Sequence, residues 1–230
     1  MIFPRRCPVC HDIVSERELL VCPECRPKLT YVKDPYCIKC GKPVKKSEVI
    51  YCEGCKNNRI TFDEGRAVFV YDDVMRKSIY RFKYNGRSEY AEFFAQEIYR
   101  KYADKIKSYN ADVIIPVPIH KSKLKSRGYN QAYLIAKELS KLTQIPVNNN
   151  YLIRVKKTKV QKNLGAKERS ANLKNAFKIR VNKVQYCSAI LIDDIYTSGA
   201  TLSACSRVLL SHGINKIYCL CICSGGFIIK

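Results

Sequence analysis

Eight of the 13 cysteines in this chain form four Cys-x-x-Cys pairs, and all four pairs lie in its first quarter. Two thiolates from one such turn can bind the same ion, and two turns together complete a tetrahedral sulfur set that favours Zn²⁺. No thioredoxin-like βαβ pattern surrounds the pairs, which disfavours a redox role. The sequence therefore predicts two structural zinc sites, with sequential and cross-braced pairing both open, formed by Cys7, Cys10, Cys22, Cys25, Cys37, Cys40, Cys52 and Cys55.

The segment from Ala189 to Thr201, AILIDDIYTSGAT, combines a buried strand, two acids and a loop of small residues. Ligands bind at the carboxyl ends of strands in a parallel sheet, and Asp193 and Asp194 stand at that position. Their carboxylates can accept hydrogen bonds from the 2′ and 3′ hydroxyls of a ribose and can bind Mg²⁺, so they are also the candidate catalytic groups. A helix N-terminus suits a phosphate, and the loop offers N–H groups and hydroxyls there from Thr197, Ser198, Gly199, Ala200 and Thr201.

These residue types also have an ordinary structural use. An Asp-Asp pair often forms a turn, and Thr or Ser often caps a helix. Two adjacent carboxylates at the end of a buried strand are nevertheless costly unless a partner compensates their charge. A sugar diol and a metal ion would do so, and the pattern therefore predicts a site for a 5-phosphorylated ribose.

Positive charge is concentrated in one stretch of the chain. The formal net charge is +22, and residues 120–183 contain 17 Lys and Arg against two Asp and Glu. Such a block favours a polyanionic partner, although a solvated basic surface is the simpler alternative. The candidate nucleic-acid contacts are Lys121, Lys123, Lys125, Arg127, Lys157, Lys159, Lys162 and Arg169. The candidate pyrophosphate contacts are Pro116, Val117 and Pro118, which follow a buried strand, together with Arg154 and Lys156.

Strands and helices are expected to alternate in the rest of the chain. Apolar patterning predicts strands at 67–71, 112–116, 152–155, 188–194 and 216–223, and helices at 72–84, 88–107, 129–142, 169–176 and 199–211, with basic loops before 129 and after 155. This alternation predicts a mainly parallel, doubly wound α/β sheet. Residues 1–60 have few large apolar groups and are expected to fold only around metal. Residues 61–230 are expected to form the α/β domain.

Composition narrows the class of protein further. The apolar fraction of 47% suits a globular protein, no apolar run is long enough to span a membrane, and the first residues lack the apolar core of a signal peptide. We therefore expect a cytoplasmic protein. The cysteines outside the four pairs are expected to pack as small apolar side chains; they are Cys187, Cys205, Cys219, Cys221 and Cys223.

Several motifs occur in an order that resembles the competence protein ComF family, from Cys7 to about Cys223. Besides the cysteine pairs and LIDDIYTSGAT, they are FKYNGR at 82–87, IPVPIHKSKLKSRGYNQA at 115–132 and RVKKTKVQKNLGAKERSANLKNAF at 154–177. The resemblance implies a type I phosphoribosyltransferase-like fold with a small zinc-ribbon-like module. It also implies binding of Mg²⁺ and phosphoribosyl pyrophosphate by the loop that follows Asp193 and Asp194. A role in handling single-stranded DNA during natural transformation is implied as well, with a ComFA-like helicase partner bound through the zinc module.

Two classes of function remain open. A binding protein would hold phosphoribosyl pyrophosphate and the backbone of single-stranded DNA, with Tyr129, Tyr133 or Tyr151 as stacking surfaces. An active phosphoribosyltransferase, of the amido or nucleobase type, would use Asp193 and Asp194 to stabilise an oxocarbenium-like transition state while pyrophosphate leaves. The sequence does not identify a pocket for the acceptor nucleophile.

Overall fold

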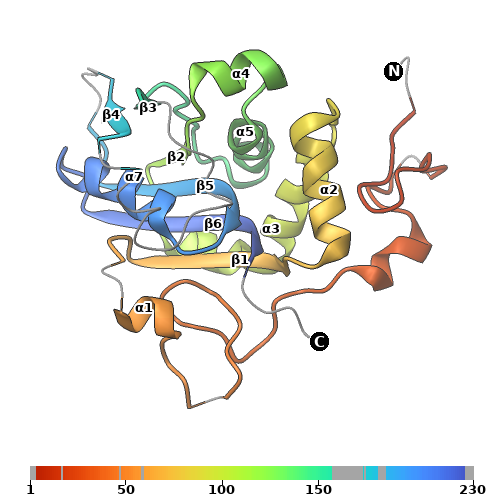
Figure 1. The fold of residues 1–230 in the computed structure, drawn as a ribbon, viewed down its shortest axis with the longest axis horizontal. Coiled ribbons are helices and arrows are strands. Elements are labelled where there is room, and N and C mark those ends of the chain that lie inside the picture. Colours follow the sequence, from red (N-terminus) through yellow and green to blue (C-terminus); the bar gives the residue numbers. More distant parts are fainter. Residues whose placement is uncertain are drawn as a thin grey trace.

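The computed structural model describes residues 4–16, 18–46, 48–57, 60–156, 173, 175–180 and 185–225. The cysteine-rich segment contains a 3-10 helix, η1 (Pro23–Lys28), and a short helix, α1 (Glu53–Asn57). The elements that follow are β1 (Glu64–Val70), α2 (Asp73–Tyr84), α3 (Tyr90–Ser108), β2 (Val113–Pro116), α4 (Lys121–Arg127), α5 (Gln131–Thr143), β3 (Leu152–Arg154), β4 (Phe177–Ile179), β5 (Ser188–Tyr196), α7 (Ala200–Leu210) and β6 (Lys216–Ser224) (Figure 1). None of the helices in these ranges combines the length and apolar character that crossing a membrane requires.

A four-stranded parallel sheet forms the centre of the molecule, with the strand order β1-β6-β5-β2. In the middle of the sheet, Ile190 of β5 pairs with Tyr218 of β6 on one side and with Ile114 of β2 on the other. Strands covered on both faces read as continuous apolar runs, and the first five residues of β5 are all buried. β5 therefore carries Asp193 and Asp194 to the carboxyl edge at the centre of the sheet.

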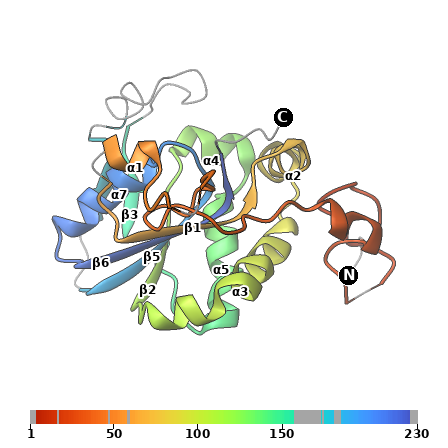
Figure 2. The same cartoon turned by 90° about the horizontal axis from the view of Figure 1, so that it is seen from below.

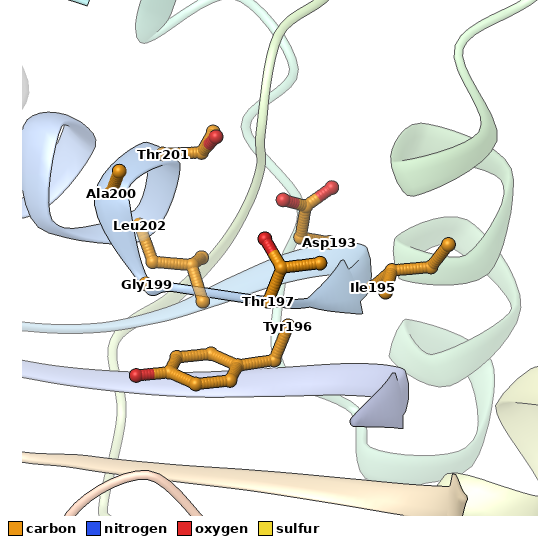
Figure 3. Close-up of a pocket in the computed structure, with 8 residues that line it drawn as sticks. All are labelled: Asp193, Ile195, Tyr196, Thr197, Gly199, Ala200, Thr201 and Leu202. Carbon is orange, nitrogen blue, oxygen red and sulfur yellow. The ribbon is translucent and has the colours of Figure 1, made fainter. Parts of the chain in front are cut away.

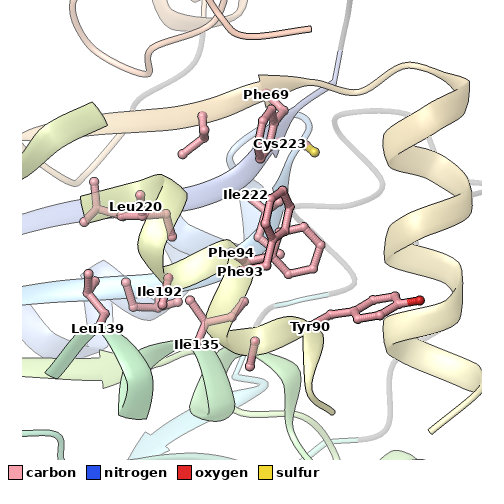
Figure 4. Close-up of a cluster of buried hydrophobic side chains, with 14 of the residues drawn as sticks. Phe69, Tyr90, Phe93, Phe94, Ile135, Leu139, Ile192, Leu220, Ile222 and Cys223 are labelled. Atoms are coloured by element: carbon pink, nitrogen blue, oxygen red, sulfur yellow. The ribbon is translucent and has the colours of Figure 1, made fainter. Parts of the chain in front are cut away.

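Helices cover both faces of this sheet. Successive side chains of a strand point to opposite faces, so Ile190 and Ile192 lie in one apolar cluster while Ala189 and Leu191 lie in another. The first cluster contains residues of α2, α3 and α5, and Figure 4 shows Phe94 of α3 among the strand side chains. The second cluster contains residues of α7, β3 and β4. The predicted parallel, doubly wound α/β architecture is thus confirmed.

Helix α4 corrects the expectation of a basic loop before residue 129. The helix begins after His120, whose ring Nδ1 accepts a hydrogen bond from Ser122 N at 3.2 Å, and it ends at Gly128, where φ is +80°. None of its residues is buried, so it lacks the apolar periodicity by which a helix is recognised in a sequence. It places Lys121, Lys123, Lys125 and Arg127 on a fixed scaffold.

Strands β3 and β4 form an antiparallel pair, with Leu152 opposite Ile179 and Arg154 opposite Phe177. β4 was absent from the predicted elements because its three residues are too few to show an apolar alternation. The short helix expected at 169–176 lies mostly outside the described residues. At one described position within it, Asn175, φ is +57°, which a right-handed helix does not allow.

The cysteine-rich segment covers the edge strand β1. Between the two halves of this segment, Val32 N donates to Val68 O and Val70 N donates to Thr30 O, each at 2.9 Å. The resulting antiparallel bridge joins Tyr31 to β1. An uncovered edge strand would offer its N–H and C=O groups to other chains, and these two hydrogen bonds close that edge.

The two halves of the segment lie on opposite faces of the sheet. Cys7 and Cys25 are buried in the apolar cluster that contains α3, whereas Cys37 and Cys40 are buried in the cluster that contains α7. Figure 2 shows the first half beyond α2 and α3, and α1 of the second half beside α7. The segment therefore packs against both faces of the sheet.

The cysteines outside the pairs are buried, as expected, with one exception. Cys205, Cys219, Cys221 and Cys223 are buried, but Cys187 is exposed. Cys187 directly precedes β5, which begins at residue 188, so the strand does not carry its side chain into the core.

Candidate functional site

Two groups of four cysteine Sγ atoms meet the geometric requirement for zinc. Within each group all Sγ atoms lie within 4.8 Å of one another. A tetrahedron with Zn–S bonds of about 2.3 Å has S···S distances of about 3.8 Å, and the Cys10–Cys22 and Cys40–Cys52 distances are both 3.7 Å. The first zinc site is formed by Cys7, Cys10, Cys22 and Cys25, and the second zinc site by Cys37, Cys40, Cys52 and Cys55. Pairing is therefore sequential, not cross-braced.

Both zinc sites are built on the same backbone turn. His11 N and Gly41 N each donate to the carbonyl of the cysteine four residues earlier, at 3.0 and 2.8 Å, and their φ angles are +77° and +69°. A Cβ on Gly41 would lie 2.7 Å from Gly65 O, so glycine is needed where the second site approaches β1. His11 instead uses its side chain, because its Nδ1 lies 2.7 Å from Tyr90 Oη on α3.

The predicted phosphate loop lies between the end of β5 and the start of α7, beside a pocket with about 180 Å³ of space that is partly open to solvent. Gly199 has a φ of +73°, and a Cβ there would lie 2.6 Å from Tyr196 Oη, so only glycine fits. Ser198 Oγ is buried, with no hydrogen-bond partner among the described residues; a bound anion would complete this polar environment. Figure 3 shows the pocket residues Asp193, Ile195, Tyr196, Thr197, Gly199, Ala200, Thr201 and Leu202.

The two acids beside the loop have different electrostatic environments. Asp193 Oδ1 accepts a hydrogen bond from Asp194 N at 2.9 Å. Burial and the charge of Asp194 raise the pKa of Asp193 from 3.8 to about 7, in spite of Lys83 and Arg154, which lower it. Asp194 has a direct cation partner, because Lys83 Nζ lies 2.5 Å from its Oδ2. A metal ion bound by Asp193 would favour its charged form.

Lys83 is a site residue that the sequence motifs leave without a role. It lies in the last turn of α2, and its side chain is only 17% exposed. Burial lowers the pKa of Lys83, but the charge of Asp194 and the hydrogen bond to it raise this pKa, and the net shift is upward. In the sequence a lysine near a helix end indicates only a solvated charge. The pairing depends on how closely α2 approaches β5, which local patterning does not reveal.

Further cations approach the acid pair from α4 and β3. Partial burial lowers the pKa of Lys123, whose side chain stays largely exposed, and the charges of Arg127, Arg154 and Lys83 lower it further. Burial also lowers the pKa of Arg154, while the charge of Asp193 opposes this shift. Such mutual effects require proximity. The structure thus brings three predicted cations together around the acids, and we call Lys83, Lys123, Arg127 and Arg154 the cation cluster.

The turn after β2 lies next to the same strand end. Val117 N donates to Ile192 O at 2.9 Å, and Asn130 Nδ2 donates to Val117 O at 3.1 Å. These bonds fix the predicted turn at Pro116–Pro118 against the residue that precedes Asp193. Among the other predicted contacts, Lys121, Lys125 and Lys156 are exposed, while Lys157, Lys159, Lys162 and Arg169 lie outside the described residues.

Two exposed aromatic residues near the cation cluster are not among those expected from the sequence. Tyr129 donates its hydroxyl to a backbone carbonyl of α2 at 2.6 Å, and Tyr151 is only 3% exposed. Tyr80 and Tyr84 of α2 are instead 58% exposed each, with ring centroids 5.0 Å apart. The Arg127 guanidinium lies 4.8 Å from the Tyr84 ring centroid and donates to its hydroxyl at 3.0 Å. This aromatic pair therefore continues into the cation cluster.

Residues 1–56 match the family described as the double zinc ribbon domain, in agreement with the two four-cysteine groups. Among solved structures, the chain is similar to a purine phosphoribosyltransferase from Pyrococcus horikoshii, with a TM-score of 0.32, 19% identity and coverage of 58% of this chain and 80% of that one. A hypoxanthine phosphoribosyltransferase from Staphylococcus aureus gives a TM-score of 0.35, 13% identity and coverage of 60% and 70%. The fold itself is shown by the parallel sheet with helices on both of its faces.

Similarity to curated proteins extends over most of the chain. DNA utilization protein YhgH of Escherichia coli is 25% identical over 226 residues, which cover 97% of this chain and 98% of that protein. Competence protein ComFC of Bacillus subtilis is 31% identical over 201 residues, covering 84% and 79%. Competence protein F of Haemophilus influenzae is 33% identical over 213 residues, covering 85% and 93%. At this identity and coverage, the chain belongs to the competence protein ComF family.

Proposed function

We propose that this protein binds phosphoribosyl pyrophosphate with Mg²⁺ beside the acid pair and binds single-stranded DNA on the neighbouring basic surface, as part of DNA uptake for natural transformation. The observation that carries the first part is the loop at Gly199. Its left-handed glycine, its unsatisfied Ser198 Oγ and the α7 N-terminus lie together beside two acids. Backbone N–H groups at a helix N-terminus favour a phosphate.

Each part of the ligand has matching residues. The 5-phosphate would bind the loop Thr197–Thr201, and the ribose hydroxyls would bind Asp193 and Asp194. The pyrophosphate would bind Arg154 and Lys156 beside the turn at Pro116–Pro118. Mg²⁺ prefers carboxylate and phosphate oxygens, and a carboxyl group whose pKa is raised to about 7 gains most from a nearby cation. The donor set therefore fits a magnesium sugar diphosphate.

Calorimetry on the zinc-loaded full chain tests this part. Phosphoribosyl pyrophosphate is expected to bind with Mg²⁺ and to bind more weakly without it, because two carboxylates and a diphosphate repel each other in the absence of the cation. Ribose 5-phosphate should retain measurable affinity and pyrophosphate alone should lose most of it, since the loop holds the 5-phosphate. Unchanged affinity in Asp193→Ala/Asp194→Ala would contradict the proposal.

The DNA-binding part rests on the aromatic pair next to the cation cluster. Bases of single strands stack on exposed aromatic rings, while cations follow the phosphates. Tyr80 and Tyr84 provide the rings, and Arg127 of α4 joins them to the basic helix. Tyr84→Ala is expected to weaken single-stranded DNA binding about tenfold, from a stacking contribution of about 1–3 kcal/mol per base. Tyr99→Ala on α3, another exposed tyrosine, is the matched control and should have little effect.

The DNA and sugar-phosphate sites share cations in this proposal. Saturating phosphoribosyl pyrophosphate is therefore expected to weaken DNA binding, since Arg127 and Arg154 lie within one cluster. A fluorescence titration of labelled single-stranded DNA with and without the sugar diphosphate measures this. Equal affinity in both titrations would show that the two ligands use separate cations.

Catalysis is the second candidate function, and the pKa of Asp193 is the observation that favours it. A carboxyl group with a pKa of about 7 can take up or release a proton at neutral pH. An amido- or nucleobase-type phosphoribosyltransferase would release pyrophosphate when ammonia or a nucleobase is added to the protein with phosphoribosyl pyrophosphate and Mg²⁺. Binding without pyrophosphate release would contradict catalysis and would leave binding as the remaining function.

A helicase partner and a cytoplasmic location complete the proposal. The two zinc sites use thiolates rather than disulfides, which suits a reducing compartment. The zinc module exposes Ile13, Ile38, Ile50 and Tyr51, and exposed apolar side chains favour docking of another protein. Loss of ComFA-like helicase binding in Ile38→Glu/Ile50→Glu, with two zinc equivalents retained, is the expected result of a pull-down with purified proteins.

A further inference from the structure

Tyr196 supports the phosphate loop from below. It is the last residue of β5, is 5% exposed and packs edge-to-face against Phe62, with ring centroids 6.3 Å apart. The space that a Cβ on Gly199 would need is filled by Tyr196 Oη at 2.6 Å. Figure 3 shows the Tyr196 ring extending back beneath Gly199. The position of the phenol ring therefore determines where the backbone at Gly199 can lie.

The same phenol ring contacts the second zinc site. Tyr196 and Cys40 lie in the same buried cluster, and the Tyr196 hydroxyl is close enough for the Cys40, Cys52 and Cys55 side chains to act on it. A phenol has one O–H donor, and a zinc-bound thiolate is an acceptor that the metal holds in a fixed position. One side chain thus connects a metal ligand to the loop.

The chain segment after the second zinc site adds further contacts to the loop. Ile60 Cδ1 lies 3.1 Å from the position of a Cβ on Gly199. Thr61 Oγ1 donates to Ser203 O in α7 at 2.9 Å. Ile60 and Thr61 therefore pack on the loop and on the first turn of its helix.

The first zinc site has no such connection among the described residues. Its own tyrosine, Tyr90, donates to Cys7 O at 3.2 Å and lies 2.7 Å from His11 Nδ1. These contacts lie in the apolar cluster of α3, on the other face of the sheet from Tyr196. The molecule therefore contains a matched pair of metal sites, each with a buried tyrosine, of which only the second reaches the phosphate loop.

We propose that Tyr196 is a positioning residue that couples the second zinc site to the phosphate loop, so that metal bound there sets the affinity for the sugar phosphate. With zinc bound, Cys40 holds the phenol, and the phenol holds Gly199 in its left-handed conformation. Without zinc the thiol group is no longer fixed, and the loop loses its support. The effect on affinity rests on the proposed binding of phosphoribosyl pyrophosphate, whereas the effect on the loop does not.

Tyr196→Phe in the full, zinc-loaded chain tests the coupling, because it removes one oxygen and keeps the ring. Zinc content should stay at two equivalents, and amide hydrogen exchange at residues 197–201 should become about tenfold faster. Affinity for phosphoribosyl pyrophosphate with Mg²⁺ should fall by about tenfold, as expected for loss of one hydrogen bond to a charged acceptor. Tyr90→Phe makes the same change at the first zinc site, and it should alter neither the amide exchange at residues 197–201 nor the affinity for phosphoribosyl pyrophosphate.

Cys52→Ser and Cys22→Ser provide a second comparison, since each removes one half-buried ligand. Each variant should lose one zinc equivalent, but only Cys52→Ser should speed exchange in the loop and weaken sugar-phosphate binding. Equal effects of the two variants, or unchanged loop exchange in both Tyr196→Phe and Cys52→Ser, would overturn the coupling. If exchange rises as expected but the wild-type chain does not bind phosphoribosyl pyrophosphate, the coupling stands and the proposed ligand is wrong.

Discussion

Asp193 is a carboxyl group in an environment that disfavours its charge. It is partly buried, it adjoins Asp194 on the same strand end, and Lys83 contacts Asp194 rather than Asp193. A natural sequence keeps such a group where a ligand compensates for it. The proposed use of Asp193 in binding therefore predicts that this carboxylate destabilises the ligand-free protein, which stability measurements can reveal.

Asp193→Asn is expected to stabilise the protein when Mg²⁺ and sugar phosphate are absent. The pKa of Asp193 in the folded chain, about 7, lies above its ordinary value of 3.8, so the folded state binds more protons than the unfolded state between these values. Stability of the wild-type chain therefore falls as pH rises toward 7, and the penalty is complete above it. A gain on the order of 1–3 kcal/mol is expected at pH 8 and almost none at pH 4.

Chemical denaturation of both proteins at pH 4, 6 and 8 measures this gain. Asp72→Asn serves as a control, because Asp72 caps α2 by accepting a hydrogen bond from Met75 N and Asn caps a helix as well as Asp does, so stability should change little. A gain at pH 8 no larger than at pH 4 would show that the Asp193 carboxyl group is not desolvated in the folded chain.

Gly199→Ala is expected to abolish sugar-phosphate binding while the chain stays folded. The backbone conformation alone costs about 1 kcal/mol for alanine, and the contact of its Cβ with Tyr196 Oη, 2.6 Å, forces either the ring or the loop to move. Calorimetry with phosphoribosyl pyrophosphate and Mg²⁺ measures the loss. Gly86→Ala is the control, since Gly86 has a similar φ of +69° but no atom within 4 Å of an added Cβ.

At the scale of elements, α4 contributes no buried side chain to the core, and in the proposed function it carries part of the DNA-binding surface. It begins at the His120 cap and ends at Gly128 with no buried residue. Of its four basic side chains, only Arg127 makes hydrogen bonds in the described part of the chain, to Tyr84 of α2 and to Gln131 of α5. Its lysines therefore remain available to phosphates, and the helix gives them a fixed spacing.

Lys121→Gln/Lys125→Gln is expected to reduce the salt dependence of single-stranded DNA binding more than any sequence preference. Each phosphate contact contributes about −0.7 to the slope of log K against log salt for single strands, so the slope should become less negative by about 1.4. Both side chains are exposed, and stability should not change. Lys137→Gln/Lys141→Gln on α5 is the matched control, and a slope change as large there would show that the basic surface is not specific to α4.

The limits of prediction from the sequence also lie at this scale. The helix expected at 72–84 is α2 at Asp73–Tyr84, and the strand expected at 188–194 is β5 at Ser188–Tyr196, because each buries an apolar pattern. α4 has no buried face and β4 is three residues long, so neither element gives the sequence a periodic pattern of apolar residues. The loop and acid pair follow from a local motif. Lys83 enters the site only through tertiary packing of α2 against β5, which no local pattern contains.

At the scale of the whole molecule, the zinc module packs into both apolar clusters of the α/β domain. Arg26 of the module forms an ion pair at 2.8 Å with Glu97, which is buried on α3 and also pairs with Arg100 at 2.7 Å. Burial raises the pKa of Glu97, but hydrogen bonds from these arginines and Tyr31 lower it, and the net shift is downward. Losing the module would leave this carboxylate with fewer partners in an apolar setting.

Residues 61–230 expressed alone are therefore expected to self-associate. Without Thr30 and Val32, the edge of β1 regains unpaired backbone groups, and the apolar side chains that contact the first and second zinc sites become exposed. Size-exclusion chromatography with light scattering over a range of concentrations measures this. A monomeric, cooperatively unfolding fragment would show that the α/β domain does not need the module.

The pairing of β1 with β6 also affects how the protein can fold during its synthesis on the ribosome. β1 is the first strand of the sheet to be synthesised, yet its partner, β6, ends at Ser224. Domains generally fold as units during synthesis, the N-terminal one first, so we expect both cysteine clusters to bind metal before the sheet forms. In this order of events β1 pairs first with the segment around Tyr31, and it pairs with β6 only after β6 has been synthesised. We therefore expect the nascent chain to bind its metals first, and the proposed sugar-phosphate loop to take its final shape only near the end of translation.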